Sequence, residues 1–388
     1  MKRGMIVPMS ENVLKKAKRI VLKIGSSSLV DEATGQIKST WLNALADDIA
    51  AARQKGREVI IVTSGAGALG RKALGIKNGK LLLPQKQAAA AVGQIRLSRA
   101  YQDIFAERGM TTAQMLLTID DFEDRKRYLN ASHTLHTLLD LGAVPVINEN
   151  DTVATSELKV GDNDRLAARV AQMAYADALI LFSDIKGLYT ADPRKDKTAE
   201  LIPVVNELTP EIESMAGAAG SNVGTGGMVT KLMAARICME AGSAMAIAMG
   251  KILYPLSTLE KTGECTWFMP SMTPVRARKA WIAASFKTKG SFVLDSGAVK
   301  ALGAGKSLLP AGIKRVEGTF ERGEAVALTD ENGVLLGKGL TAYSSYEAAQ
   351  IAGHRSADIE KLLGYHGPEE IVHRDNLVTQ KKTKGKTV

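Results

Sequence analysis

Two glycine-rich segments of the sequence each bring a lysine to a position where it could neutralise phosphate. Residues 23–28 begin with Lys23 at the end of an apolar run and continue through a glycine to three serines. Residues 224–228 precede a helical pattern with Lys231 in its first turn. Backbone N–H groups of such loops form anion sites, and a lysine adds charge. Each glycine could serve only to make a tight turn. A third such segment, residues 63–66, also follows an apolar run, and the three together favour phosphate binding.

A second group of polar residues is rich in carboxylates and amides. It comprises residues 148–151 (Asn-Glu-Asn-Asp) and 161–164 (Gly-Asp-Asn-Asp). Asn163 or Asp164 could simply cap the helix that follows. Asp151 has no such role, because a long irregular stretch follows it, and loops of that kind often bind ligands. Since carboxylates suit an ammonium group and amides suit a carboxylate, the pairing suggests an amino acid substrate.

These polar segments interrupt a regular alternation of short apolar runs and longer helical patterns. The strand-like runs are residues 20–24, 58–63, 112–117, 144–148, 178–182 and 244–249. The helical patterns are residues 41–54, 85–108, 121–139, 165–175 and 230–240. Such alternation predicts right-handed βαβ units and a mainly parallel sheet, which is the α/β class. Ligands of these sheets bind beyond the carboxyl ends of the strands, where the polar segments occur.

The pattern changes after residue 249. Residues 251–288 contain three prolines and show no clear period, which predicts a linker or an excursion. From residue 291 onward, short strand-like runs punctuated by glycine predict a small β-rich domain. The expected division is 1–18 as an N-terminal extension, 19–275 as the α/β domain, 276–288 as a linker, 289–370 as the small domain and 371–388 as a basic tail.

The composition is that of an ordinary soluble globular chain. The 388 residues are 45% hydrophobic and 24% charged, with a formal net charge of +10, which excludes disordered and collagen-like classes. Two cysteines cannot build a disulfide framework, so the cytoplasm is the expected compartment. No apolar run approaches the ~18–20 residues that span a bilayer, so no membrane is expected as a partner.

Two glycine motifs resemble nucleotide-binding fingerprints but lack the required context. Residues 65–70 fit G-x-G-x-x-G, yet no Asp or Glu occurs between Arg71 and Asp103 to hold a ribose, as a dinucleotide site requires. Residues 305–307 read Gly-Lys-Ser, but a P-loop needs a glycine where Lys300 stands. Neither a nicotinamide site nor a P-loop is expected.

Taken in order, the motifs resemble the amino acid kinase family, in particular the branch that phosphorylates the γ-carboxylate of L-glutamate. The segments that carry the resemblance are VLKIGSSSL, VIIVTSGAGALG, KQAAAAVGQ, AQMLLT, NEND, KVGDND, LFSDIKGLYTADPR, GTGGMVTK, LLPAGIKRVEGTFERGE and IAGHRS. They cover nearly the whole chain. Gly67, where the family usually has an aliphatic residue, and Ser183, where it has threonine, are small departures.

The resemblance implies a fold and a reaction. The fold is a three-layer α/β/α sandwich around a mainly parallel sheet, followed by a small β-rich PUA domain. The reaction uses ATP and Mg²⁺ to form L-glutamyl 5-phosphate, the first step of proline biosynthesis, and proline is the expected feedback inhibitor. The resemblance also implies a homo-oligomer, whose size the sequence does not give.

The resemblance also assigns roles to individual residues. Lys23 and Lys231 would flank the phosphates, with Asp164 orienting both lysines. The glutamate-binding residues would be Ser64, Asp151 and Asn163, with Asp151 on the ammonium group. The nucleotide-binding residues would be Lys23, Ser183, Asp184, Thr225, Gly226, Gly227, Met228, Val229, Thr230 and Lys231. Mg²⁺ would be held mostly by phosphates and water, so no protein ligand is named.

Two other functions stay open at this point. One is a different kinase of the same fold, such as an acetylglutamate kinase or an aspartokinase. The other is RNA binding by the PUA-like region, because residues from Arg276 onward carry 18 Lys and Arg against 12 Asp and Glu. Against RNA binding as the main role, that region lacks the interleaved aromatic residues of a base-stacking surface.

Overall fold

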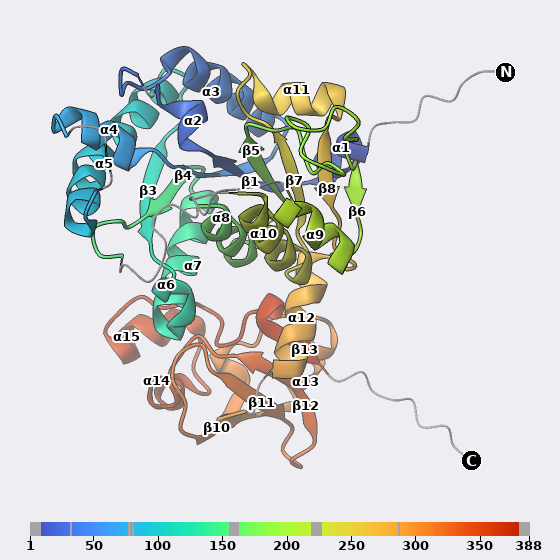
Figure 1. Ribbon diagram of the computed structural model, residues 1–388. Coiled ribbons are helices and arrows are strands. Elements are labelled where there is room, and N and C mark those ends of the chain that lie inside the picture. Colours follow the sequence, from blue (N-terminus) through green and yellow to red (C-terminus); the bar gives the residue numbers. More distant parts are fainter. Residues whose placement is uncertain are drawn as a thin grey trace, which may run out of the picture. The chain divides into compact units, whose positions relative to one another are not determined.

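A computed structural model describes residues 9–379, apart from residues 32, 77–78, 80, 155–162, 219–226 and 286–287. Its internal contacts divide the chain into two compact units, with the boundary between Pro274 and Val275 in the sequence. Figure 1 shows both units.

The first unit is built on one sheet, to which the described residues contribute eight strands. In their order across the sheet they are β3 (Thr112–Leu117), β4 (Val144–Glu149), β2 (Glu58–Val62), β1 (Arg19–Ile24), β5 (Ala178–Ser183), β7 (Ala244–Met249), β8 (Cys265–Phe268) and β6 (Val204–Val205). Neighbouring strands from β3 to β7 are parallel, and only the β7–β8 pair is antiparallel. The carboxyl ends of β1, β2, β4, β5 and β7 therefore meet at one edge.

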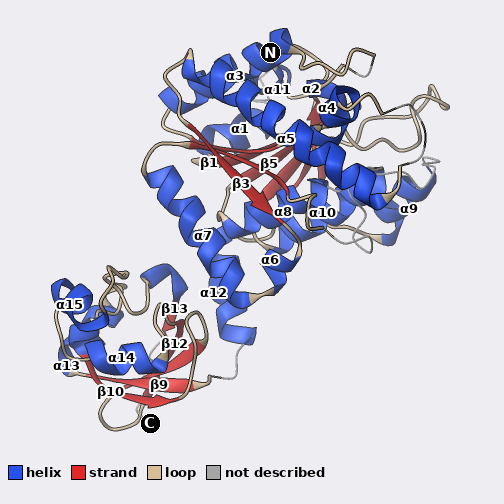
Figure 2. Cartoon of the chain, turned by 90° about the vertical axis from the view of Figure 1, so that its left-hand side faces the viewer, coloured by secondary structure: helices blue, strands red, loops and turns tan. Residues whose placement is uncertain are grey.

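Successive side chains of the central strand β1 point to opposite faces of the sheet, and both faces are buried. In β1, Ile20, Leu22 and Ile24 belong to one hydrophobic core, whereas Val21 belongs to the other. The first core is covered by α1 (Met9–Lys16), α2 (Ser26–Leu29), α3 (Ser39–Gln54), α4 (Ala66–Ala73), α5 (Leu83–Ala106) and α11 (Pro255–Thr262). The second is covered by α7 (Arg125–Asp140), α8 (Asn163–Met173), α9 (Pro210–Ala218) and α10 (Met228–Glu240). Figure 2 shows the sheet between these two helical layers, which confirms the predicted three-layer α/β/α sandwich.

The structure differs from the sequence-based expectation at both ends of this unit. Leu14 and Ala17 of the expected N-terminal extension are buried in the first core. Residues 251–268 contain α11 and β8 rather than an irregular excursion. The side chain of Asp48 on α3 accepts from the backbone N–H of Leu256 at 2.8 Å, which anchors the start of α11 because this N–H has no partner within the helix.

The second unit is the small β-rich domain. Its sheet has the order β10 (Ile313–Gly318), β9 (Gly290–Leu294), β11 (Ala325–Thr329), β12 (Leu335–Leu340) and β13 (Leu377–Thr379). The β9–β11 pair is parallel and the other pairs are antiparallel. The helices of this unit are α12 (Pro274–Ser285), α13 (Ser296–Gly303), α14 (Ser345–Ile351) and α15 (Ile359–Leu363). Phe292 and Phe320 meet edge to face in its core.

Two segments outside the expected limits of the small domain pack within it. Helix α12 occupies most of the expected linker, and its Ile282 packs against Ala325 and Leu340. Ile371 and Val372, at the start of the expected basic tail, are fully buried, and β13 follows them. Within the part of the chain that the structure describes, no helix is long and apolar enough to cross a membrane.

Candidate active site

Asp164 lies between two lysines at the carboxyl edge of the large sheet. Its Oδ1 is 2.5 Å from Nζ of Lys23, and its Oδ2 is 2.8 Å from Nζ of Lys231. Thr230 also lies within hydrogen-bonding distance of Oδ2, at 3.2 Å. Burial alone would raise the pKa of the Asp164 carboxyl, but the two lysine charges outweigh it and lower the pKa to about 2. Asp164 is therefore anionic at neutral pH and holds both lysine side chains in place.

Local structure explains why these three side chains meet. Lys23 is the penultimate residue of β1, on the same side of the strand as Val21, and is partly exposed near the carboxyl end of the strand. Asp164 is in the first turn of α8, which follows β4 in the chain. Lys231 is in the first turn of α10, whose N-cap is Gly227. Two helix N-termini therefore converge near one strand end, an arrangement that favours anions.

A network of amides holds the neighbouring strand ends together. The side-chain amide of Asn163 donates to Ser64 Oγ at 2.8 Å, to Asn148 Oδ1 at 2.9 Å and to the backbone oxygen of Thr63. Asn148 in turn donates to Gln94 Oε1 at 2.9 Å. Because Ser64 Oγ accepts from Asn163, its own hydroxyl proton can be donated to a ligand.

Asp151 lies two residues beyond the end of β4, and no residue that the structure describes supplies it with a counter-ion. Among the residues that the structure describes, its side chain has no hydrogen bond or ion pair. Burial raises the pKa of its carboxyl to about 6. An ionised carboxylate in this position needs a cation, so the position suits a ligand ammonium group.

Two cavities meet at these residues. The first has a volume of about 620 Å³ and the second about 530 Å³. Both are lined by Ser183, Asp184 and Lys231. The first cavity is also lined by the second lysine of the bridge, by the amide network and by the carboxylate beyond β4. These residues are Lys23, Ser64, Asn148, Asn163 and Asp151.

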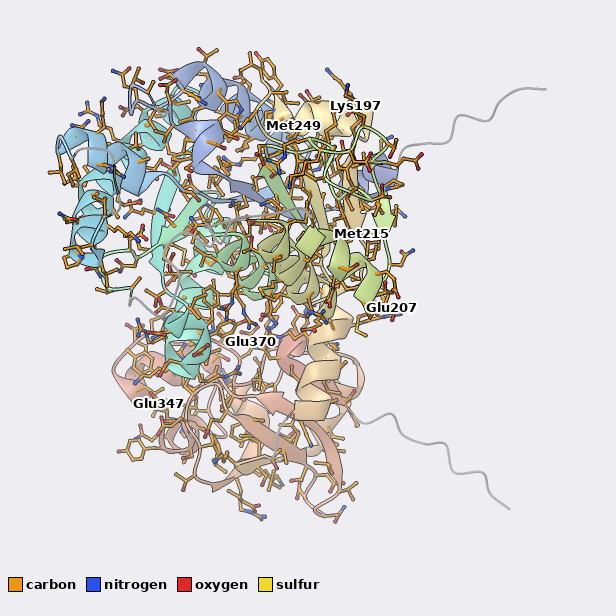
Figure 3. All side chains as sticks on the ribbon, viewed as in Figure 1. Lys197, Glu207, Met215, Met249, Glu347 and Glu370 are labelled. Atoms are coloured by element: carbon orange, nitrogen blue, oxygen red, sulfur yellow. The ribbon has the colours of Figure 1, made fainter. Side chains whose placement is uncertain are left out.

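Part of the wall of the second cavity is apolar. It is lined by Leu188 and by three methionines, Met215, Met228 and Met249. Figure 3 labels Met215 on α9 and Met249 at the end of β7. An apolar wall in a cavity that also carries charged side chains, such as Asp184 and Lys231, suits a ligand with a ring and a polar tail.

The structure brings together most of the site residues expected from the sequence. Lys23, Ser64, Asp151, Asn163, Ser183, Asp184 and Lys231 line the first cavity, and Gly227 and Met228 line the second. Thr230 contacts Asp164, while Val229 is 41% exposed and lines neither cavity. Thr225 and Gly226 lie outside the described residues. Sequence reasoning missed Arg71 and Lys86, which also line the first cavity.

The G-x-G-x-x-G segment serves helix packing. Gly65 caps α4 with φ +107°, a conformation that suits glycine. A Cβ on Gly70 would lie 1.7 Å from the backbone oxygen of Ala89 in α5. Gly67 lies inside α4 with open space around it. The close crossing of α4 and α5 therefore explains Gly70 without a dinucleotide.

Comparison with known proteins defines the class. The model of the amino acid kinase family matches residues 18–248, and the PUA domain model matches residues 290–363. The chain belongs to the amino acid kinase family, with a C-terminal PUA domain.

Its curated relatives define the branch of that family. A glutamate 5-kinase of Paramagnetospirillum magneticum is 60% identical over 367 residues, 95% of this chain and 99% of that one. Those of Rhodospirillum rubrum and Paracoccus denitrificans are 59% and 54% identical, over 92% and 94% of this chain and 96% and 98% of theirs. Within the family, this chain groups with the glutamate 5-kinases.

Proposed function

We propose that this protein transfers the γ-phosphoryl group of ATP to the γ-carboxylate of L-glutamate. The products are ADP and L-glutamyl 5-phosphate, and the reaction is the first step of proline biosynthesis. The observation that carries the proposal is the Lys23–Asp164–Lys231 bridge, whose Lys231 lines both cavities. The first cavity accepts glutamate, and the second accepts the nucleoside of ATP.

The chemistry needs no general base. A glutamate γ-carboxylate, with a reference pKa of about 4.3, is already ionised at neutral pH. One carboxylate oxygen attacks the γ-phosphorus, a P–O bond forms, and the bond to the ADP oxygen breaks. Repulsion between two anions is the obstacle, so catalysis depends on positioning and on positive charge. Lys23 and Lys231 supply that charge, and Asp164 positions them.

The substrate's charged groups match the first cavity. Asp151 binds the ammonium group, and the hydroxyl of Ser64 donates to a substrate carboxylate. Asn163 holds Ser64 and Asn148 in place. ADP release measured with L-glutamate, L-aspartate and N-acetyl-L-glutamate tests this assignment. L-Glutamate should be strongly preferred, whereas preference for either of the other acids would indicate another kinase of the same fold.

The residues between the cavities also fit Mg²⁺ with ATP. Among the described residues, Asp184 is the carboxylate that lines both cavities, and carboxylate oxygens are ligands that Mg²⁺ accepts together with phosphates and water. When bound, the ion neutralises phosphate charge. Asp184 would hold it beside the phosphates.

Other properties are proposed on the family resemblance. They are a cytoplasmic location, assembly as a homo-oligomer and feedback inhibition by proline. RNA binding by the PUA domain is a further proposal, supported by the basic charge from residue 276 onward. It predicts an affinity for RNA that falls steeply with added salt.

A further inference from the structure

The mechanism leaves two of the cations in the first cavity without a role. Among the described residues, four cationic side chains line this cavity, and two of them are the lysines paired with Asp164. Arg71 donates to the backbone oxygen of Gly79 at 2.9 Å. The side chain of Lys86 has no hydrogen bond or ion pair with any residue that the structure describes. Lys86 is therefore the cation best able to meet a ligand anion.

Lys86 faces the cavity because of its place on α5. Lys86, Ala89 and Ala90 all line the cavity, and residues three and four apart share one face of a helix. The two alanines are 1% and 4% exposed. This face of α5 is thus a cavity wall, and Lys86 is at its N-terminal and more exposed end.

The loop that carries Asp151 indicates that Lys86 would contact the α-carbon end of an amino acid substrate. Gln87 donates from its side chain to the backbone oxygen of Ala154 at 3.1 Å. This bond ties the first turns of α5 to the loop that carries Asp151. The ammonium group and the α-carboxylate of an amino acid are attached to one carbon atom, so the groups that bind them must be neighbours. The γ-carboxylate must instead lie beside the phosphoryl-binding lysines.

We propose that Lys86 binds the α-carboxylate of the substrate and selects for substrates that carry it. The proposal rests on the proposed function, because it assigns one further group of the same substrate. Lys86 and Asp151 then hold the two charges of the α-carbon, and the γ-carboxylate extends toward Lys23 and Lys231. Selection is electrostatic, since an amide of the same shape has no charge for Lys86 to pair with.

Calorimetric binding of L-glutamate and of its α-amide, L-isoglutamine, tests the proposal. The wild-type protein should bind glutamate about 10-fold more tightly, the lower end of what a charged hydrogen bond contributes. Lys86→Met should weaken glutamate binding by that factor and leave isoglutamine and ATP binding unchanged. Lys86→Arg should keep most of the preference. Arg96→Met, an exposed change on the same helix that does not line the cavity, is the matched control.

The proposal is overturned by unchanged glutamate affinity in Lys86→Met, or by equal losses for glutamate and isoglutamine. Unfolding temperatures of all variants show whether a loss reflects folding. The binding readout does not depend on turnover. If the wild-type protein distinguishes the two ligands but forms no acyl phosphate, the proposed reaction fails while the role of Lys86 stands.

Discussion

Lys231 donates to Oδ2 of Asp164 across 2.8 Å, although 67 positions separate the two residues in the chain. The other oxygen of that carboxylate meets Lys23. With the pKa of Asp164 lowered to about 2, the charge of this carboxylate does not change near neutral pH. Any pH dependence of the reaction between pH 5 and pH 8 must therefore arise elsewhere.

Replacing Lys231 should slow the chemical step far more than it weakens substrate binding. Lys231→Met removes a preorganised charge from the transferring phosphoryl group, and such a loss typically costs about 10²–10³ in kcat. The KM for glutamate should change little, because Asp151 and Ser64 are untouched. Steady-state kinetics with each substrate in turn measures both effects.

The matched control is Lys261→Met, an exposed lysine on α11 that lines neither cavity. It should leave kcat unchanged. A folded Lys231→Met variant with nearly wild-type turnover would remove Lys231 from the phosphoryl-transfer step.

The titration of Asp151 should set the acid limb of the kcat/KM profile. Only the ionised carboxylate attracts the substrate ammonium group, and burial raises its pKa to about 6. The kcat/KM for glutamate should therefore be constant above that pH and fall as the pH is lowered through it. At saturating glutamate, kcat should depend less on pH, because the bound ammonium group favours the ionised form.

Asp151→Asn provides the check on this assignment. It should raise the KM for glutamate by about 10–150-fold, keep the KM for ATP and abolish the limb near pH 6. Above that pH it should also stabilise the fold, since it removes a partly buried charge that no described residue neutralises. If the variant retains the fall in kcat/KM near pH 6, another group is responsible for it. If the variant loses affinity for ATP, Asp151 belongs to the nucleotide site and not to the glutamate site.

Replacement by alanine should change the unfolding temperature differently at two glycines of α4. Gly70→Ala places a methyl group 1.7 Å from the Ala89 backbone oxygen, so α4 and α5 must separate. Thermal unfolding should shift to lower temperature and the KM for glutamate should rise. Gly67→Ala meets open space and should be neutral or slightly stabilising. Equal unfolding temperatures for the two variants would contradict this account of the helix crossing.

The first unit should fold and act without the second. Every candidate catalytic and binding residue lies between Lys23 and Lys231, and residues 1–274 form a compact unit. A cut there leaves α12 with the small domain that buries Ile282. Residues 1–274 should be soluble and show glutamate-dependent ADP release. A folded product without activity at saturating substrates would mean that the second unit completes the active site.

The alternation of the sequence was sufficient to predict the sandwich, because β1 to β5 and β7 are apolar runs separated by long helices. It failed in residues 251–288. The strand β8 is only four residues long, and Pro270 and Pro274 flank the turn before α12. The pairing of β8 with β7 is a long-range contact that no local pattern encodes.

Residues on the loops after strands could be predicted as site candidates, since the edge of a parallel sheet is where ligands bind. Lys86 and Met215 could not, because their helices follow none of the strand-end motifs and the two residues reach the cavities only through packing. None of the predicted strands ends directly before either residue. The three-way contact of Asp164 likewise depends on how α8 and α10 pack together.

The most direct test of phosphoryl transfer to glutamate uses L-glutamate labelled with ¹⁸O in its γ-carboxylate. The enzyme, ATP, Mg²⁺ and hydroxylamine convert it to γ-glutamyl hydroxamate and inorganic phosphate. If the carboxylate oxygen attacks the γ-phosphorus, that oxygen leaves with the phosphate when hydroxylamine attacks the acyl carbon. Mass spectrometry should then find one ¹⁸O atom in each phosphate released and one hydroxamate for each ADP. Phosphate without ¹⁸O, or ADP without hydroxamate, would contradict the account, because water rather than glutamate would have received the phosphoryl group.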